Sequence, residues 1–194
     1  TANDLAMRGA RPLYLSAGFI LEEGLPMEDL GRIAASMAWA CRQAGVQLVT
    51  GDTKVVGKGQ GDGVYINTSG IGRRNRALEH DLAVVKKHRP QFSSRWLLDS
   101  NVHSGDKIIL SGTIGDHGLA VLSSREGYGF GTKIVSDVAP LNKIILLLLN
   151  EAGGIVAMKD PTRGGLSNAL NEWSQKSKVG ILVDEEKIPI REEV

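Results

Sequence analysis

The sequence is poor in cysteine and has no long apolar run. Cys41 is the only cysteine, so no disulfide can form within the chain, and a reducing, cytoplasmic setting is the expectation. The longest wholly apolar stretch, residues 144–149, is far shorter than the roughly 20 residues that a membrane-spanning helix needs. The first residues lack the pattern of a signal peptide. A disulfide-stapled scaffold is therefore excluded, and no membrane partner is expected.

The chain also has no excess of charge of either sign. Lysine and arginine number 23 against 22 aspartate and glutamate residues, which gives a net charge of +1. This balance gives no reason to expect nucleic acid or an acidic membrane surface as a partner. With 42% hydrophobic residues in 194, the chain can bury a core in one large domain or two small ones.

Both ends have the character of positions inside a longer protein. The chain starts at Thr1, within a predicted helix, and stops at Val194 shortly after the turn-like residues 188–190. We expect it to be an internal section of a larger polypeptide.

Helical and strand patterns alternate in two stretches of the chain. In the first stretch we predict helices over 3–10 and 26–44 and strands over 13–21, 46–50 and 64–69. In the second we predict strands over 108–110, 155–158 and 179–183 and helices after 111–118, from 140 to 153 and over 166–177. The fold class is therefore α/β or α+β, in two units.

The stretch between these units has a different composition. Residues 73–104 are rich in basic side chains, contain three histidines and have little periodicity. We interpret them as a surface linker or insertion. The predicted domains are then residues 1–72 and residues 105–194.

Three aspartates lie in settings that suit a magnesium–phosphate site. Asp4 follows Asn3 in the first helix, while Asp52 and Asp160 each follow a predicted strand and lie near glycines. Carboxylates are preferred Mg²⁺ ligands, and glycine turns before a helix let backbone N–H groups approach phosphate oxygens. The alternative is that these aspartates only cap helices and turns, which is their commonest role.

Two further side chains could act in catalysis. Lys54 directly follows Asp52-Thr53 and could face a phosphate or polarise a carbonyl group, although its spacing alone favours a solvated lysine at the end of a strand. His117 could be a proton donor or acceptor, a common role of histidine side chains, but could also be purely structural. The glycines of residues 57–63 are not followed by a helix, and no Gly-Lys-Ser/Thr motif occurs, so dinucleotide and P-loop classes are rejected.

Taken together, the motifs resemble a known family. The NDLAM sequence at 3–7 is similar to the Asn-Asp helix of the PurM-like superfamily. Five further segments resemble the HypE branch of this superfamily. They are residues 14–28, TGDTKVV at 50–56, residues 66–68, SGTIGDHG at 111–118 and DPTRGG at 160–165. The similarity covers most of residues 1–72 and 105–194. It implies a two-domain fold, in which the N-terminal domains of a homodimer form a shared β-barrel flanked by helices and the C-terminal domain is an α/β sandwich.

The resemblance also implies a chemistry, the maturation of [NiFe] hydrogenase. Proteins of the HypE branch carry on a C-terminal cysteine a carbamoyl group delivered by the carbamoyltransferase HypF. ATP activates the carboxamide oxygen, loss of phosphate leaves a thiocyanate, and the cyanide passes to iron on the HypC–HypD complex. The implied cofactors are ATP and Mg²⁺.

Site residues are carried over by their positions in these motifs. Asp4, Asp52 and Asp160 match the metal positions, and Lys54 and His117 are the catalytic candidates. The nucleotide-binding set comprises Asn3, Asp4, Asp52, Thr53, Asp160, Thr162, Gly164 and Gly165.

Two departures leave rival functions open. The family's N-terminal glycine-rich segment and its cysteine-bearing tail are not in this sequence, and Cys41, predicted in mid-helix, cannot replace that cysteine. One rival is a non-catalytic module for dimerisation or partner docking, which would bind no Mg-ATP. Another is a different ATP-using PurM-like enzyme such as thiamine-monophosphate kinase.

Overall fold

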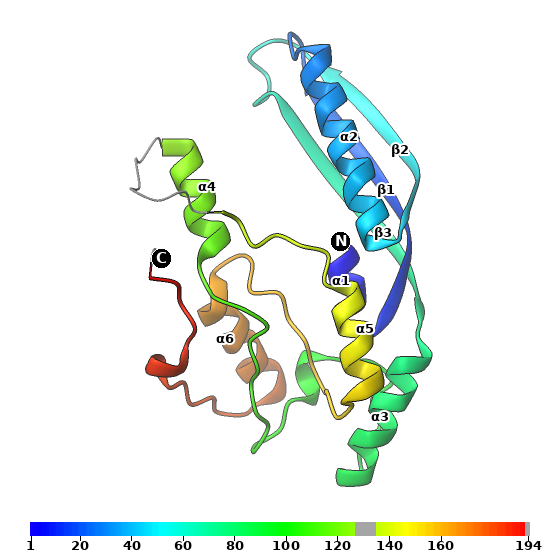
Figure 1. Ribbon diagram of the computed structural model, residues 1–194, viewed down its shortest axis with the longest axis vertical. Helices are drawn as coiled ribbons and strands as arrows, with labels where there is room; N and C mark the ends of the chain where they lie inside the picture. The colour runs from blue at the N-terminus through cyan, green and yellow to red at the C-terminus, as the bar shows by residue number, and fades with distance from the viewer. Residues whose placement is uncertain (127–134, 193–194) are drawn as a thin grey trace. The chain divides into compact units, whose positions relative to one another are not determined.

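A computed structural model describes residues 1–126 and 135–192, with the side chains of 125 and 126 left aside. The chain forms two compact units (Figure 1). The first comprises Thr1–Leu97 and Pro140–Met158, and the second comprises Leu98–Ala139 and Lys159–Val194. Each unit is considered separately below. Within the described residues, no helix is both long enough and apolar enough to cross a membrane.

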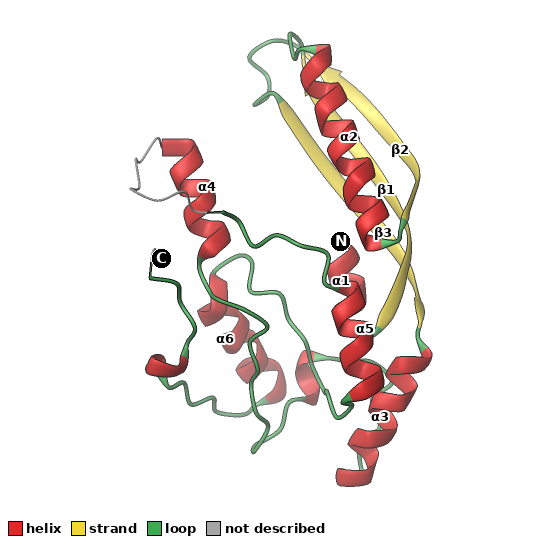
Figure 2. Ribbon diagram, in the orientation of Figure 1, coloured by secondary structure: helices red, strands yellow, loops and turns green. Residues whose placement is uncertain are grey.

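The first unit is built around a sheet of three long strands, shown in yellow in Figure 2. The strands are β1 (Ala10–Glu22), β2 (Gln47–Val56) and β3 (Val64–Arg74), in the order β2-β1-β3. β1 pairs in parallel with β2 and antiparallel with β3. All three predicted strands of this half are confirmed. β1 is only partly covered, with Pro12 and Ala17 as its buried residues.

β2 extends farther than its apolar pattern indicated. The prediction ended this strand at Thr50, but its pairing with β1 continues from Gly51 to Val56. Asp52 and Lys54 therefore lie within a strand and not in a turn after one, because the β1 backbone offers partners along the whole segment. The register shifts once, between Leu15 and Ser16, where β2 has an extra residue.

Two helices accompany the sheet. α1 (Ala2–Met7) precedes β1 in the sequence. α2 (Met27–Ala44) connects β1 to β2 and runs along one side of the sheet (Figure 1). The limits of α2 agree with the sequence signals. Pro26 occupies the N-cap, where its missing N–H costs nothing, and Gly45 ends the helix in the left-handed conformation. Cys41 on this helix is partly buried.

The connection from β2 to β3 is held by a single carboxylate. Residues 57–63 form turns without a following helix, in agreement with the rejection of a nucleotide-binding fingerprint. Glu22, at the end of β1, accepts hydrogen bonds from the N–H groups of Gly59 (2.5 Å) and Gly63 (3.0 Å). These two bonds, Gly63 first, lower the pKa of Glu22.

The interpretation of residues 73–104 as a surface linker is wrong for its helical part. α3 (Arg76–His88) buries Leu78, Leu82 and Val85, which recur at helical spacing beneath a basic outer face. The basic residues hid this period. Leu97, farther along the same segment, is fully buried as well.

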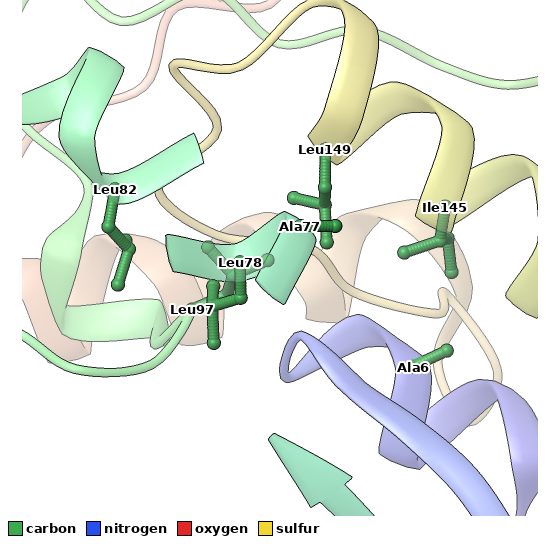
Figure 3. Close-up of a cluster of buried hydrophobic side chains, with 7 residues drawn as sticks. All are labelled: Ala6, Ala77, Leu78, Leu82, Leu97, Ile145 and Leu149. Atoms are coloured by element: carbon green, nitrogen blue, oxygen red, sulfur yellow. The ribbon is translucent and has the colours of Figure 1, made fainter. Parts of the chain in front are cut away.

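α3 and α5 (Asn142–Glu151) form the core of the first unit with α1. The seven buried side chains in Figure 3 are Ala6, Ala77, Leu78, Leu82, Leu97, Ile145 and Leu149. Asp81, also fully buried on α3, accepts a hydrogen bond from Ile155 N at 2.8 Å. This bond fixes the chain directly after the Gly153-Gly154 turn that ends α5. The segment interpreted as a linker thus supplies four of these seven core side chains.

The second unit contains α4 (Asp116–Glu126), α6 (Gly165–Ser177) and the short 3₁₀ helices η1 (Asp99–Asn101) and η2 (Glu185–Lys187). η1 packs against α6. Both α4 and α6 were predicted from the sequence and are confirmed.

Three predicted strands, at 108–110, 155–158 and 179–183, are not formed in the described part of the chain. Their apolar composition is that of strands, but none of the three belongs to a sheet in the part of the chain that the structure describes. Apolar pattern alone does not make a strand, since the ladder of hydrogen bonds is what defines it. Asp160 consequently follows a segment without regular secondary structure, and not a strand.

Candidate functional site

Asp52 and Lys54 lie on one face of β2. Side chains alternate along a strand, so these two residues project to the same side, about 7 Å apart along the chain direction. Thr53, between them, projects from the opposite face, and its N–H donates to Asp52 Oδ1 at 2.8 Å. Asp52, Thr53 and Lys54 are all exposed. The strand therefore presents a carboxylate and an ammonium group side by side, open to a ligand.

An open depression of about 650 Å³ follows β2 and the neighbouring part of β1. It is lined by Ala17, Phe19, Leu48, Val49, Thr50, Gly51, Asp52 and Thr53. The depression is shallow and open to solvent, and its lining combines apolar residues with Thr50, Asp52 and Thr53.

The helix α1 carries the first pair of predicted site residues. Asn3 Oδ1 accepts a hydrogen bond from Leu141 N at 2.8 Å, which joins α1 to the start of α5. Asp4 has an exposed carboxylate 3.3 Å from the amino group of Thr1. Asn3 thus has a structural role in the fold, whereas the Asp4 carboxylate faces solvent.

The sheet lies between α1 and the face that carries Asp52. Thr1 Oγ1 is 2.6 Å from Thr68 Oγ1, and Thr68 pairs through Ala17 with Gly51, on the face opposite to Asp52. Within this unit the structure does not bring Asp4 and Asp52 together. Among residues 1–126 and 135–192, no three histidine, cysteine, aspartate or glutamate side chains are gathered as a metal site.

Asp160, Thr162, Gly164 and Gly165 form a loop in the second unit that leads directly into α6. Gly164 is the N-cap with φ 78°, Gly165 has φ 60°, and Gly165 N donates to Thr162 O at 2.7 Å. Positive φ at both glycines turns the backbone into the helix without the strain that other residues would have. The amide groups at a helix N-terminus attract anions, so this loop is suited to a phosphate.

A buried ion-pair cluster adjoins this loop, and sequence reasoning missed it. Asp99, 3% exposed, accepts hydrogen bonds from Lys176 Nζ (2.7 Å), Lys159 Nζ (3.2 Å) and Trp173 Nε1 (3.3 Å). Burial by itself would raise the pKa of Asp99, but the hydrogen bonds from Lys176 and Lys159 outweigh it and hold the pKa below its ordinary value. The spacing of Glu172 and Lys176 hinted at part of this cluster, but Asp99 lies over 70 residues away in sequence.

His117, the second catalytic candidate, lies exposed at the start of α4. Its Nδ1 is 3.0 Å from Ser136 Oγ. The preceding Asp116 is 1% exposed, accepts a hydrogen bond from Thr113 Oγ1 (2.5 Å) and pairs with Arg191 Nε (3.3 Å). His117 and Lys54 belong to different units, and each is described within its own.

Both parts of the chain match models of one protein family. The model of the AIR synthase related protein N-terminal domain matches residues 1–74, and that of the C-terminal domain matches residues 103–194. Carbamoyl dehydratase HypE of Azotobacter vinelandii is 49% identical over 194 residues, which cover all of this chain and 52% of that protein. The chain thus spans about half the length of the curated relatives it matches.

Solved structures give the same result. A crystal structure of a HypE–HypF complex matches with a TM-score of 0.87 and 48% identity, over 100% of this chain and 58% of that one. A HypE in complex with ATP matches with a TM-score of 0.87 and 44% identity, over 100% of this chain and 52% of that one. Thiamine monophosphate kinase of Aquifex aeolicus, at 20% identity and a TM-score of 0.70, covers 97% of this chain and 57% of that one, and shows a shared fold alone.

The fold and the two domain matches define the class, the AIR synthase related proteins with the PurM-like fold. The identity of about 48% along the whole chain also identifies the family within this class. The chain belongs to the HypE family. The family and the α/β fold class that the sequence predicted are both confirmed.

Proposed function

We propose that this chain forms part of an ATP-dependent carbamoyl dehydratase that matures [NiFe] hydrogenase. In the proposed reaction the oxygen of a carbamoyl group on a C-terminal cysteine takes the γ-phosphoryl group of ATP. ADP is released, the nitrogen loses its two protons as phosphate leaves with that oxygen, and the carbon–nitrogen unit remains on sulfur as thiocyanate. The observation that carries the proposal is the exposed Asp52–Lys54 face beside the depression along β2. The single cysteine supports a cytoplasmic setting.

The predicted site residues have the oxygen ligands and backbone N–H groups that a nucleotide and its metal ion require. Asp4 and Asp52 offer exposed carboxylates, and Asp160 stands at the start of a loop that ends on a helix N-terminus. Magnesium held by such oxygens would neutralise phosphate charge. Asn3, Thr53, Thr162, Gly164 and Gly165 complete the proposed nucleotide-binding set.

Lys54 is proposed to hold the carboxamide oxygen and to stabilise the negative charge that develops there as the phosphoryl group is transferred. Its place on an exposed strand, on the same face as Asp52, supports this role. His117 is proposed as an acid–base group, in keeping with its exposed ring and its contact with Ser136.

We also propose a homodimer formed through the sheet. β2 lies at the edge of the sheet, and Val49, Val55, Tyr65 and Ile71 are each at least half exposed. Open edges and exposed apolar side chains on strands favour pairing with another chain. HypF and the HypC–HypD complex are the other proposed partners, and the HypE–HypF complex structure supports the first of them. The proposed domains are residues 1–72 and 105–194, with 73–104 between them.

Calorimetric titration with Mg-ATP tests the nucleotide part of this proposal. The unaltered chain is expected to bind, and Asp52→Asn and Asp160→Asn to bind at least tenfold more weakly, because each removes a ligand charge. Asp62→Asn, an exposed aspartate of the 57–63 turn, serves as the matched control and is expected to bind normally.

Each outcome separates the candidate functions. Absence of binding by the unaltered, folded chain would favour a module for dimerisation or docking, which the exposed apolar strands also suit. Equal affinity in all three variants would place the nucleotide elsewhere. For the dimer, Val55→Lys is expected to lower the mass measured by light scattering, whereas Leu182→Lys, at a fully exposed position in the second unit, is not.

A further inference from the structure

One side chain, Glu172 on α6, is hydrogen-bonded to both ends of the loop that contains Asp160. At the start of the loop, Lys159 Nζ lies 2.6 Å from Glu172 Oε2. At its end, Asn168 Nδ2 lies 2.9 Å from Glu172 Oε1 and 3.2 Å from the carbonyl oxygen of Arg163. The two oxygens of a single carboxylate therefore reach both flanks of the loop.

The spacing along α6 makes this arrangement possible. Asn168, Glu172 and Lys176 follow one another at intervals of four residues, so they share one face of the helix. The hydrogen bonds from Lys159 and Lys176 lower the pKa of Glu172, which keeps this carboxylate ionised. Glu172 thus accepts hydrogen bonds with both of its carboxylate oxygens.

The start of the loop has a second anchor in Asp99. Lys159 lies between the buried Asp99 carboxylate, at 3.2 Å, and Glu172, at 2.6 Å. Lys159 itself is 18% exposed, so its position is restricted by packing as well as by charge. The residue directly before Asp160 is therefore held from two sides.

The end of the loop is restricted by its backbone. Gly164 has φ 78°, and a Cβ built on it would lie 2.7 Å from the Cβ of Asn168. Asn168 N also donates to Gly164 O. The side chain that bridges to Glu172 is thus packed directly on the turn into α6.

We propose that Glu172 is a positioning residue for the phosphate-binding loop of residues 160–165. By holding Lys159 and, through Asn168, the carbonyl of Arg163, it fixes the loop in the conformation that presents the Asp160 carboxylate and the first amide groups of α6. This inference rests on the proposed nucleotide-binding function. It assigns to Glu172 no contact with the nucleotide itself.

The test compares Glu172→Gln with Lys176→Met. The first variant keeps the size of the side chain but cannot accept from both Asn168 and Lys159, since its Nε2 is a donor. The second removes a partner of Asp99 and Glu172 and leaves both links to the loop. Thermal unfolding of each variant shows whether the fold persists.

Two readouts follow the loop and the ligand independently. Amide hydrogen exchange in the absence of nucleotide reports on Gly165 N, which donates to Thr162 O across the loop. Glu172→Gln is expected to speed this exchange and to weaken Mg-ATP binding roughly tenfold, as loss of an outer partner of a ligand does. Lys176→Met is expected to leave Gly165 exchange and Mg-ATP affinity within twofold of the unaltered chain.

Two substitutions of Lys159 test whether a positive charge at this position is enough to hold the loop. Lys159→Arg retains a cation that both carboxylates can accept from and is expected to bind nearly as the unaltered chain does, whereas Lys159→Gln is expected to behave as Glu172→Gln. Unchanged Gly165 exchange in Glu172→Gln, or an equal loss in Lys176→Met, would overturn the positioning role. If the unaltered chain binds no Mg-ATP, the proposed function fails, while faster exchange confined to Glu172→Gln would still support the role in holding the loop.

Discussion

The side chain of Leu78 occupies the space next to Gly9 where any other residue would place its Cβ. A Cβ built on Gly9 would lie 2.7 Å from both δ carbons of Leu78, and Gly9 has φ +84°. The turn from α1 into β1 therefore packs directly on the fully buried leucine of α3. The packing between these two segments, which are nearly 70 residues apart in sequence, therefore requires a residue without a Cβ at position 9.

Gly9→Ala is expected to lower the free energy of unfolding by about 2–4 kcal/mol, from the left-handed backbone and the clash together. Gly45→Ala is the matched control, since Gly45 has φ +67° but no atom within 4 Å of its Cβ position. Its expected cost is about 1–2 kcal/mol, the backbone part alone. Chemical denaturation measures both. Equal losses would show that the Leu78 contact contributes nothing.

Asp81 is expected to make stability depend on pH. Burial, opposed by the hydrogen bond from Ile155, raises its pKa from 3.8 to about 6. Because the folded-state pKa is the higher one, the native state binds the proton more tightly. The contribution of Asp81 to the free energy of unfolding is therefore greatest below pH 3.8, declines as the pH rises to about 6, and is constant above that. The free energy of unfolding falls by roughly 3 kcal/mol over this range.

Asp81→Asn keeps an acceptor for Ile155 N and cannot ionise, so this decline between pH 4 and 6 is expected to disappear. Denaturation curves at several pH values measure it. Glu79→Gln, an exposed position on the same helix, should retain the decline. The same slope in Asp81→Asn and the unaltered chain would assign the pH dependence to another group.

Glu22→Gln is expected to loosen the turn between β2 and β3. The carboxylate accepts from Gly59 N and Gly63 N with separate oxygens, and the amide that replaces it has only one acceptor. Amide exchange at Gly59 and Gly63 should become faster. Glu23→Gln, at the exposed neighbouring position, should leave both rates unchanged. Unaltered rates in Glu22→Gln would mean that the backbone alone holds the turn.

Arg191→Met is expected to destabilise the second unit by about 1–3 kcal/mol, because it leaves the buried Asp116 carboxylate without its cation. Lys187→Met removes an ion pair with Asp184 between two exposed residues and should change stability by less than about 0.5 kcal/mol. The double variant Asp116→Asn, Arg191→Met should recover part of the loss in thermal unfolding. If Arg191→Met and Lys187→Met lower the stability equally, the ion pair of Asp116 with Arg191 contributes no more than an exposed ion pair does.

The helices with clear terminal signals were predictable from the sequence. Pro26 and Gly45 bound α2, and Gly164 caps α6, which begins at Gly165, because capping depends on residues within one turn of the helix end. The motifs that resemble the HypE branch were likewise readable, and the comparisons confirm the family. The site residues remain a prediction, placed but not yet tested.

The tertiary structure decided what depends on partners distant in sequence. Pairing with β1 carries β2 through Asp52 and Lys54, while the apolar segments at 108–110 and 179–183 form no strand among the described residues. The apolar face of α3 lay beneath basic residues and became evident only from its contacts with α5. The convergence of Asp99, Lys159 and Glu172 is of the same kind. The sequence by itself determined helix limits and family, because those signals are local, whereas strand pairing and buried charge clusters depend on segments that only the folded chain brings together.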